Sequence, residues 1–148
     1  AITDDGQVLD ALNEVYLGHP RHQSARYLLQ VGRATAELQS SSGLLCGTGT
    51  GATGWCRSAW LERHCDFTLP TPTAPALAWF VREAWPSPVT GTAFTEGVLG
   101  ADDALEIVSQ HDNLVVFGDG IEHDALQLTW GQRITLRRSE RTLRLVRA

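Results

Sequence analysis

The segment 41–60, SSGLLCGTGTGATGWCRSAW, constrains the fold more strongly than any other part of the chain. It starts with a short apolar run, and glycine then occupies every second position of residues 47–51. In residues 55–64, WCRSAWLERH, apolar residues recur at the spacing of one helix face. A strand, a glycine loop and a helix in this order bring the backbone close to a phosphate group or a flat ring. We therefore expect a helix over residues 54–64, with a candidate binding loop in front of it.

Two common nucleotide motifs are excluded by the surroundings of this loop. Residues 49–54, GTGATG, match the GxGxxG pattern of Rossmann domains. A Rossmann site also needs a parallel βαβ unit and an acidic residue about twenty positions further on. That position falls in residues 69–75, LPTPTAP, which contain no acid. A Walker phosphate loop is excluded as well, because no lysine precedes a threonine or serine of the loop.

Two interpretations of the glycine stretch remain. In the first, the loop is a tight turn that leads into a helix and binds nothing. In the second, the hydroxyl groups of Thr48, Thr50 and Thr53 contact a nucleotide together with the exposed backbone of the glycines. Trp55 then offers a flat face on which a base stacks. Alternatively, the Trp55 ring packs in the core. The density of hydroxyl groups favours the second interpretation.

The rest of the chain predicts short antiparallel strands, because β-forming residues alternate with polar ones between frequent turn signals. The proline-rich segment 66–76 is expected to be a loop. Gly118-Asp119-Gly120 predicts a hairpin turn. We therefore expect one mainly β domain over residues 1–148, with antiparallel, sandwich-like layered sheets and one internal helix after the glycine-rich loop. The expected strands cover residues 8–9, 15–17, 24–31, 34–39, 77–85, 92–98, 105–109, 114–117, 125–130, 133–138 and 142–146. For residues 77–85 a helix is the alternative, and the β-forming residues and the prolines that follow favour the strand.

Composition narrows the class of protein. Hydrophobic residues make up 43% of the chain, which is enough for an ordinary core, and the formal charge of −5 argues against charge-driven binding of nucleic acid. No apolar run approaches the roughly 18 residues of a membrane helix, and no signal peptide is evident. The three cysteines lack CxxC spacing, so neither a disulfide framework nor a zinc ribbon is expected and a cytoplasmic location is predicted. The absence of methionine, even at position 1, predicts a piece of a longer protein.

Four groups of charged or metal-ligating residues invite a functional interpretation. His19 with His22, and residues 64–66, do not complete a metal-ligand pattern, so no metal site is predicted. Residues 119–124 contain four titratable side chains, and we expect a solvated hairpin turn there. Five arginines lie near the end of the sequence, and we expect them on an exposed sheet face or against acidic residues of another domain or subunit: Arg137, Arg138, Arg141, Arg144 and Arg147.

Two motifs in order resemble those of the NAD kinase family. Residues 11–14, ALNE, resemble its Asn-Glu (or Asn-Asp) segment, and residues 47–55, GTGTGATGW, resemble its S-T-P-T-G-S-T-A-Y segment. Ser58 matches a downstream serine, and residues 115–146 resemble the closing strands of the family around an Asp-Gly turn. The likeness covers nearly the whole chain.

The resemblance implies a fold and a reaction. NAD kinases transfer the γ-phosphoryl group of ATP, with a divalent metal such as Mg, to the adenosine 2′-hydroxyl of NAD, and the product is NADP. Their N-terminal α/β domain carries a Gly-Gly-Asp-Gly segment whose Asp acts as the base. Their C-terminal β-rich domain supplies much of the NAD pocket and the contacts of a homo-oligomer. The chain is therefore expected to be this C-terminal domain, with no catalytic residue of its own and with the α/β domain absent from it.

The resemblance also implies the site. Eight residues are expected to bind NAD: Asn13, Glu14, Thr50, Gly51, Thr53, Gly54, Trp55 and Ser58. Departures from the family pattern are Ser42 for an Asp, Gly49 for the Pro and Trp55 for the Tyr, and no Gly-Gly-Asp-Gly segment is present. Without the resemblance, residues 13–14 would be an ordinary turn and Thr53 a helix cap. Two other functions stay open: a non-catalytic dinucleotide-binding or assembly module, and the β domain of a sphingosine or diacylglycerol kinase.

Overall fold

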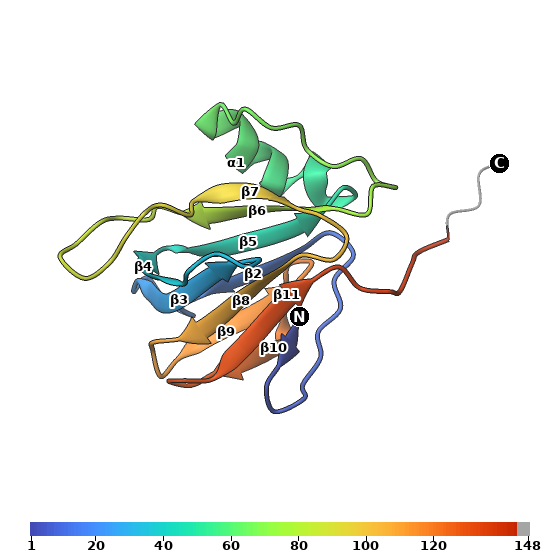
Figure 1. The fold of residues 1–148 in the computed structure, drawn as a ribbon. Coiled ribbons are helices and arrows are strands. Elements are labelled where there is room, and N and C mark those ends of the chain that lie inside the picture. The colour runs from blue at the N-terminus through green and yellow to red at the C-terminus, as the bar shows by residue number, and fades with distance from the viewer. Residues whose placement is uncertain (145–148) are drawn as a thin grey trace.

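The computed structural model describes residues 1–144 and consists of two antiparallel sheets with one α-helix outside them (Figure 1). One sheet has five strands in the order β1-β11-β8-β3-β4, and the other has six in the order β10-β9-β2-β5-β6-β7. This confirms the mainly β, layered class expected from the sequence. The elements are β1 (Ile2–Thr3), β2 (Glu14–Gly18), β3 (Ala25–Val31), β4 (Glu37–Ser41), β5 (Gly43–Thr48), the 3₁₀ helix η1 (Gly51–Thr53), α1 (Trp55–Arg63), β6 (Leu77–Arg82), β7 (Glu96–Leu99), β8 (Ala104–Ser109), β9 (Leu114–Gly118), β10 (Ile121–Leu128) and β11 (Arg133–Arg137).

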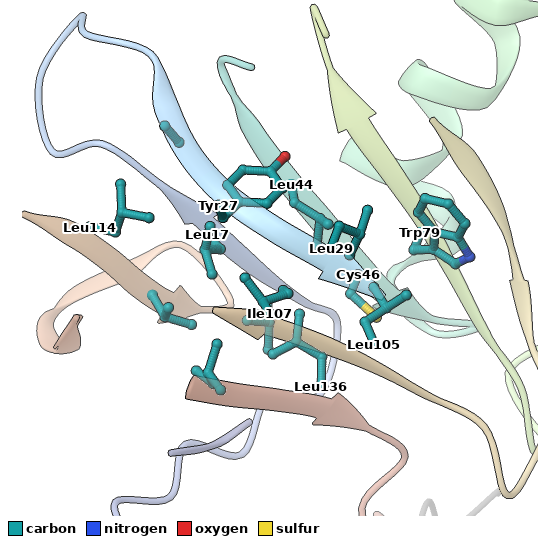
Figure 2. Packing of buried hydrophobic residues seen from close by; sticks show 14 of the residues in the cluster. Leu17, Tyr27, Leu29, Leu44, Cys46, Trp79, Leu105, Ile107, Leu114 and Leu136 are labelled. Carbon is teal, nitrogen blue, oxygen red and sulfur yellow. The ribbon is translucent and has the colours of Figure 1, made fainter. Parts of the chain in front are cut away.

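The main core lies between the two sheets (Figure 2). The five-stranded sheet contributes Tyr27, Leu29 and Ile107, and the six-stranded sheet contributes Leu17 and Leu44, all fully buried. Side chains of successive strand residues point to opposite faces, so β2, β3 and β8 need an apolar residue only at every second position. The alternation expected from the sequence therefore places one face of each sheet in this core.

Helix α1 lies over the outer face of the six-stranded sheet (Figure 1), and a second core lies between them. Strands β5 and β6 are buried on both faces, because Leu45 and Phe80 point towards the helix while their neighbours point into the main core. Cys56 of α1 is fully buried against them. Arg63, at the end of the helix, donates hydrogen bonds to the carbonyls of Val81 and Thr95 and so fixes α1 to the sheet.

Several element boundaries differ from the prediction. Residues 8–9 form no strand but one isolated bridge, Ile2 to Val8. Strand β4 starts at Glu37, because residues 32–36 form the turn. Strand β7 starts at Glu96, because the N–H groups of Ala93 and Phe94 donate to the carboxylate of Glu37 instead of to a strand.

Two further differences concern the end of the chain. Strand β10 starts at Ile121, directly after the hairpin turn, and not at residue 125. Residues 142–144 form no strand, since β1 and β8 already occupy the two sides of β11, and residues 145–146 lie outside the described part. Within residues 1–144, no helix is long and apolar enough to cross a membrane.

Candidate functional site

The two segments that carry the predicted motifs meet at one end of the six-stranded sheet. Strands β2 and β5 are antiparallel neighbours, and Glu14 pairs with Gly47. Beyond this pair, the Thr48 N–H donates to the Asn13 carbonyl at 2.8 Å, and the Thr48 hydroxyl donates to the Leu12 carbonyl at 2.6 Å. The fold therefore brings Asn13 and Glu14 against the glycine loop, although about 35 residues separate the motifs.

The glycine loop is organised by one hydroxyl group. The oxygen of Thr48 accepts hydrogen bonds from the N–H groups of Thr50 at 3.1 Å and Gly51 at 3.3 Å. Gly51 then packs against the backbone of Asn13, and a Cβ at this position would lie 2.5 Å from the Asn13 carbonyl carbon. Glycine is needed here for close approach of two backbones, and its φ angle is not left-handed.

The segment 12–14 is held from the other side by the β9–β10 hairpin. The carboxylate of Asp119 accepts hydrogen bonds from three consecutive N–H groups: Leu12 at 2.8 Å, Asn13 at 2.6 Å and Glu14 at 3.2 Å. In return, the Asp119 N–H donates to the Glu14 carbonyl at 2.9 Å. Consecutive N–H groups that converge in this way form an anion-binding nest, which Asp119 fills.

A cavity of about 610 Å³ opens beside this junction. Asn13, Glu14, Thr48 and Thr50 contribute to one wall. The proline loop before β6 and the segment that follows β11 also line the cavity. Small-molecule sites have volumes of roughly 300–1,000 Å³, so the cavity is large enough for a substantial part of a nucleotide.

The side chains of Asn13 and Glu14 are free to bind a ligand. Both are half-buried, and neither forms a side-chain hydrogen bond within residues 1–144. Partial burial raises the pKa of the Glu14 carboxyl, and the nearby charge of Asp119 raises it further. Burial, with a smaller contribution from Glu14, raises the pKa of the Cys56 thiol to about 12, so this cysteine is a neutral packing residue.

Glu14→Gln is expected to stabilise the protein at pH 7. Because the pKa of Glu14 is raised in the folded state, ionisation of its carboxyl opposes folding as the pH rises above the ordinary carboxyl value. The gain should therefore disappear below about pH 4, where Glu14 is protonated in both states. Thermal unfolding of both proteins between pH 3.5 and 7.5 checks this, with exposed Glu62→Gln as control. A variant less stable than the wild type throughout this range would contradict it.

The other predicted site residues lie apart from the cavity. Thr53, Gly54 and Ser58 are exposed at the start of α1, and none of them lines the cavity. Thr53 is not the helix cap, since Gly54 occupies that position without a side-chain hydrogen bond. Gly51 is buried under the loop.

Trp55 lies on the outer face of the six-stranded sheet. Its ring stacks on Tyr16, with centroids 5.3 Å apart and an angle of 18° between the planes. The Arg82 guanidinium lies 5.2 Å from its centroid, which is a cation–π distance. The Trp55 indole therefore packs against Tyr16 and Arg82, on the sheet face that points away from the main core.

The eight predicted NAD-binding residues do not include Thr48 or Asp119. The Thr48 hydroxyl is expected from the sequence to contact a nucleotide, but its spacing from the glycines gives no sign of the hydrogen bonds that it forms within the protein. Asp119 was expected in a solvated turn, but it is half-buried and bonded to residues 12–14, whereas Glu122, His123 and Asp124 are exposed. Its position in Gly-Asp-Gly was a usable signal for a left-handed turn, and its φ is 53°.

Among residues 1–144, no group of three or more His, Cys, Asp or Glu side chains is placed to hold a metal ion. A metal that needs three or more such protein ligands therefore has no site among the described residues.

Two solved protein structures are similar to this fold. An NAD kinase from Archaeoglobus fulgidus, solved in complex with ATP, superposes with a TM-score of 0.64 over 88% of this chain and 46% of that chain, at 18% identity. Yeast NADH kinase, solved with NADH, superposes with a TM-score of 0.67 over 88% of this chain and 35% of that chain, also at 18% identity. The chain has an NAD kinase-like fold.

The chain spans less than half the length of each of these two proteins, 46% and 35% respectively. No family model matches the sequence, and no curated protein matches it. The two structural superpositions confirm the fold that the sequence resemblance implies.

Proposed function

We propose that the chain is the NAD-binding β domain of an NAD kinase-type enzyme, whose complete form phosphorylates the adenosine 2′-hydroxyl of NAD with ATP to give NADP. One observation carries the proposal: two segments about 35 residues apart place the free side chains of Asn13 and Glu14 beside Thr48 and Thr50 in one cavity of about 610 Å³. Solved proteins with this fold are described in complex with ATP and with NADH, which supports a nucleotide as ligand.

The chemistry of this wall suits an adenosine. The Asn13 amide can donate to and accept from a base edge, and the Glu14 carboxylate accepts hydrogen bonds from ribose hydroxyls. Thr50 adds a further hydroxyl at the cavity. Thr53, Gly54, Trp55 and Ser58 lie outside this cavity, so their contact with the ligand is a separate part of the proposal, which Thr53→Val tests.

In this proposal the chain binds and orients NAD, and the α/β domain supplies the reacting groups. Phosphoryl transfer depends on positioning and on neutralising the charge of the phosphates. The base, ATP and its Mg would be supplied with the α/β domain, because the sequence has no Gly-Gly-Asp-Gly segment. We therefore expect no NADP formation by the chain alone, and measurable formation would overturn this division. Cytoplasmic location and a homo-oligomer formed through this domain belong to the same proposal.

Calorimetric titration of the 148-residue chain with NAD, NADP and ATP tests the proposed function. We expect Asn13→Ala to weaken NAD binding about tenfold, because it removes two hydrogen bonds from a partly buried site. Asn113→Ala is the matched control, since Asn113 is exposed in the β8–β9 turn away from the cavity. Thr53→Val reports separately on the residues near α1.

Three outcomes would contradict the proposal in different ways. If the wild type binds no nucleotide, the dinucleotide function is wrong. If Asn13→Ala and Asn113→Ala bind NAD equally well, the cavity is not the site. Binding of sphingosine or diacylglycerol in place of nucleotide would favour a lipid kinase domain.

A further inference from the structure

We propose that Arg137, Arg138 and Arg141 form an anion subsite that binds the diphosphate of the dinucleotide. The inference rests on the proposed function for the identity of the ligand and on the cavity for its position. All three arginines line the same cavity as Asn13 and Glu14. Arg137 is the last residue of β11, and the other two lie on the segment that continues along the cavity.

The arginines form a local excess of positive charge in an acidic chain. The formal net charge is −5, with twelve basic residues in total, yet three of them line this one cavity. Arg141 pairs with Asp10 at 3.0 Å. Within residues 1–144, Arg137 and Arg138 have no ion-pair partner. Two exposed guanidinium groups therefore remain available to an anion.

The distribution of charge sets the orientation of the ligand. Glu14 and Asp10 are the acidic residues of the cavity lining, and a phosphate beside Glu14 would be repelled. A guanidinium group presents a planar fork of donors that matches phosphate oxygens. A dinucleotide in this cavity thus has its adenosine at Asn13 and Glu14 and its diphosphate at the arginines.

The test compares three probes on the wild type and on the double variant R137Q/R138Q. NAD carries adenosine and diphosphate, adenosine lacks phosphate, and inorganic pyrophosphate lacks the nucleoside. We expect the double variant to bind NAD and pyrophosphate about tenfold more weakly, while adenosine binding is unchanged. The dependence of NAD binding on salt should also decrease.

Two control variants sharpen this comparison. R33Q removes an exposed arginine from the β3–β4 turn, away from the cavity, and should leave all three probes unaffected. Asn13→Ala should weaken NAD and adenosine but not pyrophosphate. Equal losses of NAD binding in R33Q and R137Q/R138Q would show a general charge effect and overturn the subsite.

The outcomes separate this inference from the proposed function. If the wild type and R137Q/R138Q bind NAD equally, the subsite is wrong and the proposed function stands. If the wild type binds neither NAD nor adenosine, the proposed function is wrong and the pyrophosphate titration decides. If the wild type then binds pyrophosphate and R137Q/R138Q does not, the anion subsite is supported. If the wild type does not bind pyrophosphate, the anion subsite is wrong.

Discussion

Gly51→Ala is expected to destabilise the protein by about 3 kcal/mol, the upper end of the usual range for overpacking. An alanine Cβ would lie 2.5 Å from the carbonyl carbon of Asn13 and 2.9 Å from its Cα. Because both neighbours are backbone atoms, no side-chain rotation relieves the clash. The glycine loop must move away from residues 12–14, so NAD binding should be lost as well. Thermal unfolding should show a Tm lower by roughly 6–12 °C.

The matched control for this prediction is Gly100→Ala. At Gly100 an added Cβ would lie 3.1 Å from the Asp103 carboxylate, which accepts a hydrogen bond from the Gly100 N–H at 3.0 Å and needs to shift by only a few tenths of an ångström in this exposed turn. The control should therefore change stability by well under 1 kcal/mol. A Gly51→Ala protein that unfolds at the temperature of the wild type would show that Gly51 does not approach Asn13 as described.

Asp119→Ala is expected to cost about 2–3 kcal/mol and to weaken NAD binding. It leaves the N–H groups of Leu12, Asn13 and Glu14 without their acceptor. Hydrogen bonds to a charged group contribute about 1.5–3 kcal/mol each when buried, and partial exposure lowers the sum here. Alanine also tolerates the left-handed conformation of residue 119 less well than aspartate does. Chemical denaturation gives the stability change, and titration with NAD gives the effect on the site.

Two further variants isolate the role of the Asp119 carboxylate. Asp119→Asn tolerates the left-handed turn and keeps one acceptor oxygen, so its stability should lie between those of the wild type and the alanine variant. Asp124→Ala removes an exposed aspartate from β10 of the same hairpin and should be nearly neutral. Equal effects of Asp119→Ala and Asp124→Ala would mean that the three hydrogen bonds do not stabilise residues 12–14.

Local sequence patterns predicted most of the fold. The helix over residues 54–64 is α1, and the β-formers after the proline loop form β6 as expected. The errors occur where a distant side chain competes for the backbone. Residues 93–94 had the composition of a strand, but Glu37, more than fifty residues earlier, accepts their N–H groups. A pattern within a few residues carries no record of such a partner.

Some residues of the candidate site were predicted from the sequence, and others became evident only in the structure. The sequence supplied Asn13, Glu14 and Thr50, because the resemblance named the two motifs, and the structure places these three residues on one cavity. It did not supply Asp119 or the arginines. Asp119 lies more than one hundred residues beyond Asn13, and the arginines are expected from the sequence on an exposed sheet face or against acidic residues of another domain or subunit. Their proximity to the site arises from the pairing of β2 with β9 and from the position at which β11 ends.

The glycine stretch shows what each level determined. By itself, the sequence determined that a strand, a tight loop and a helix follow one another between residues 43 and 63, because glycine spacing and apolar periodicity act over a few residues. Only the tertiary structure decided what the loop contacts. Gly51 contacts the backbone of Asn13, Thr48 bonds to the carbonyls of residues 12–13, and both segments border one cavity. These contacts depend on strand order, and strand order is set by burial of the facing surfaces of the two sheets.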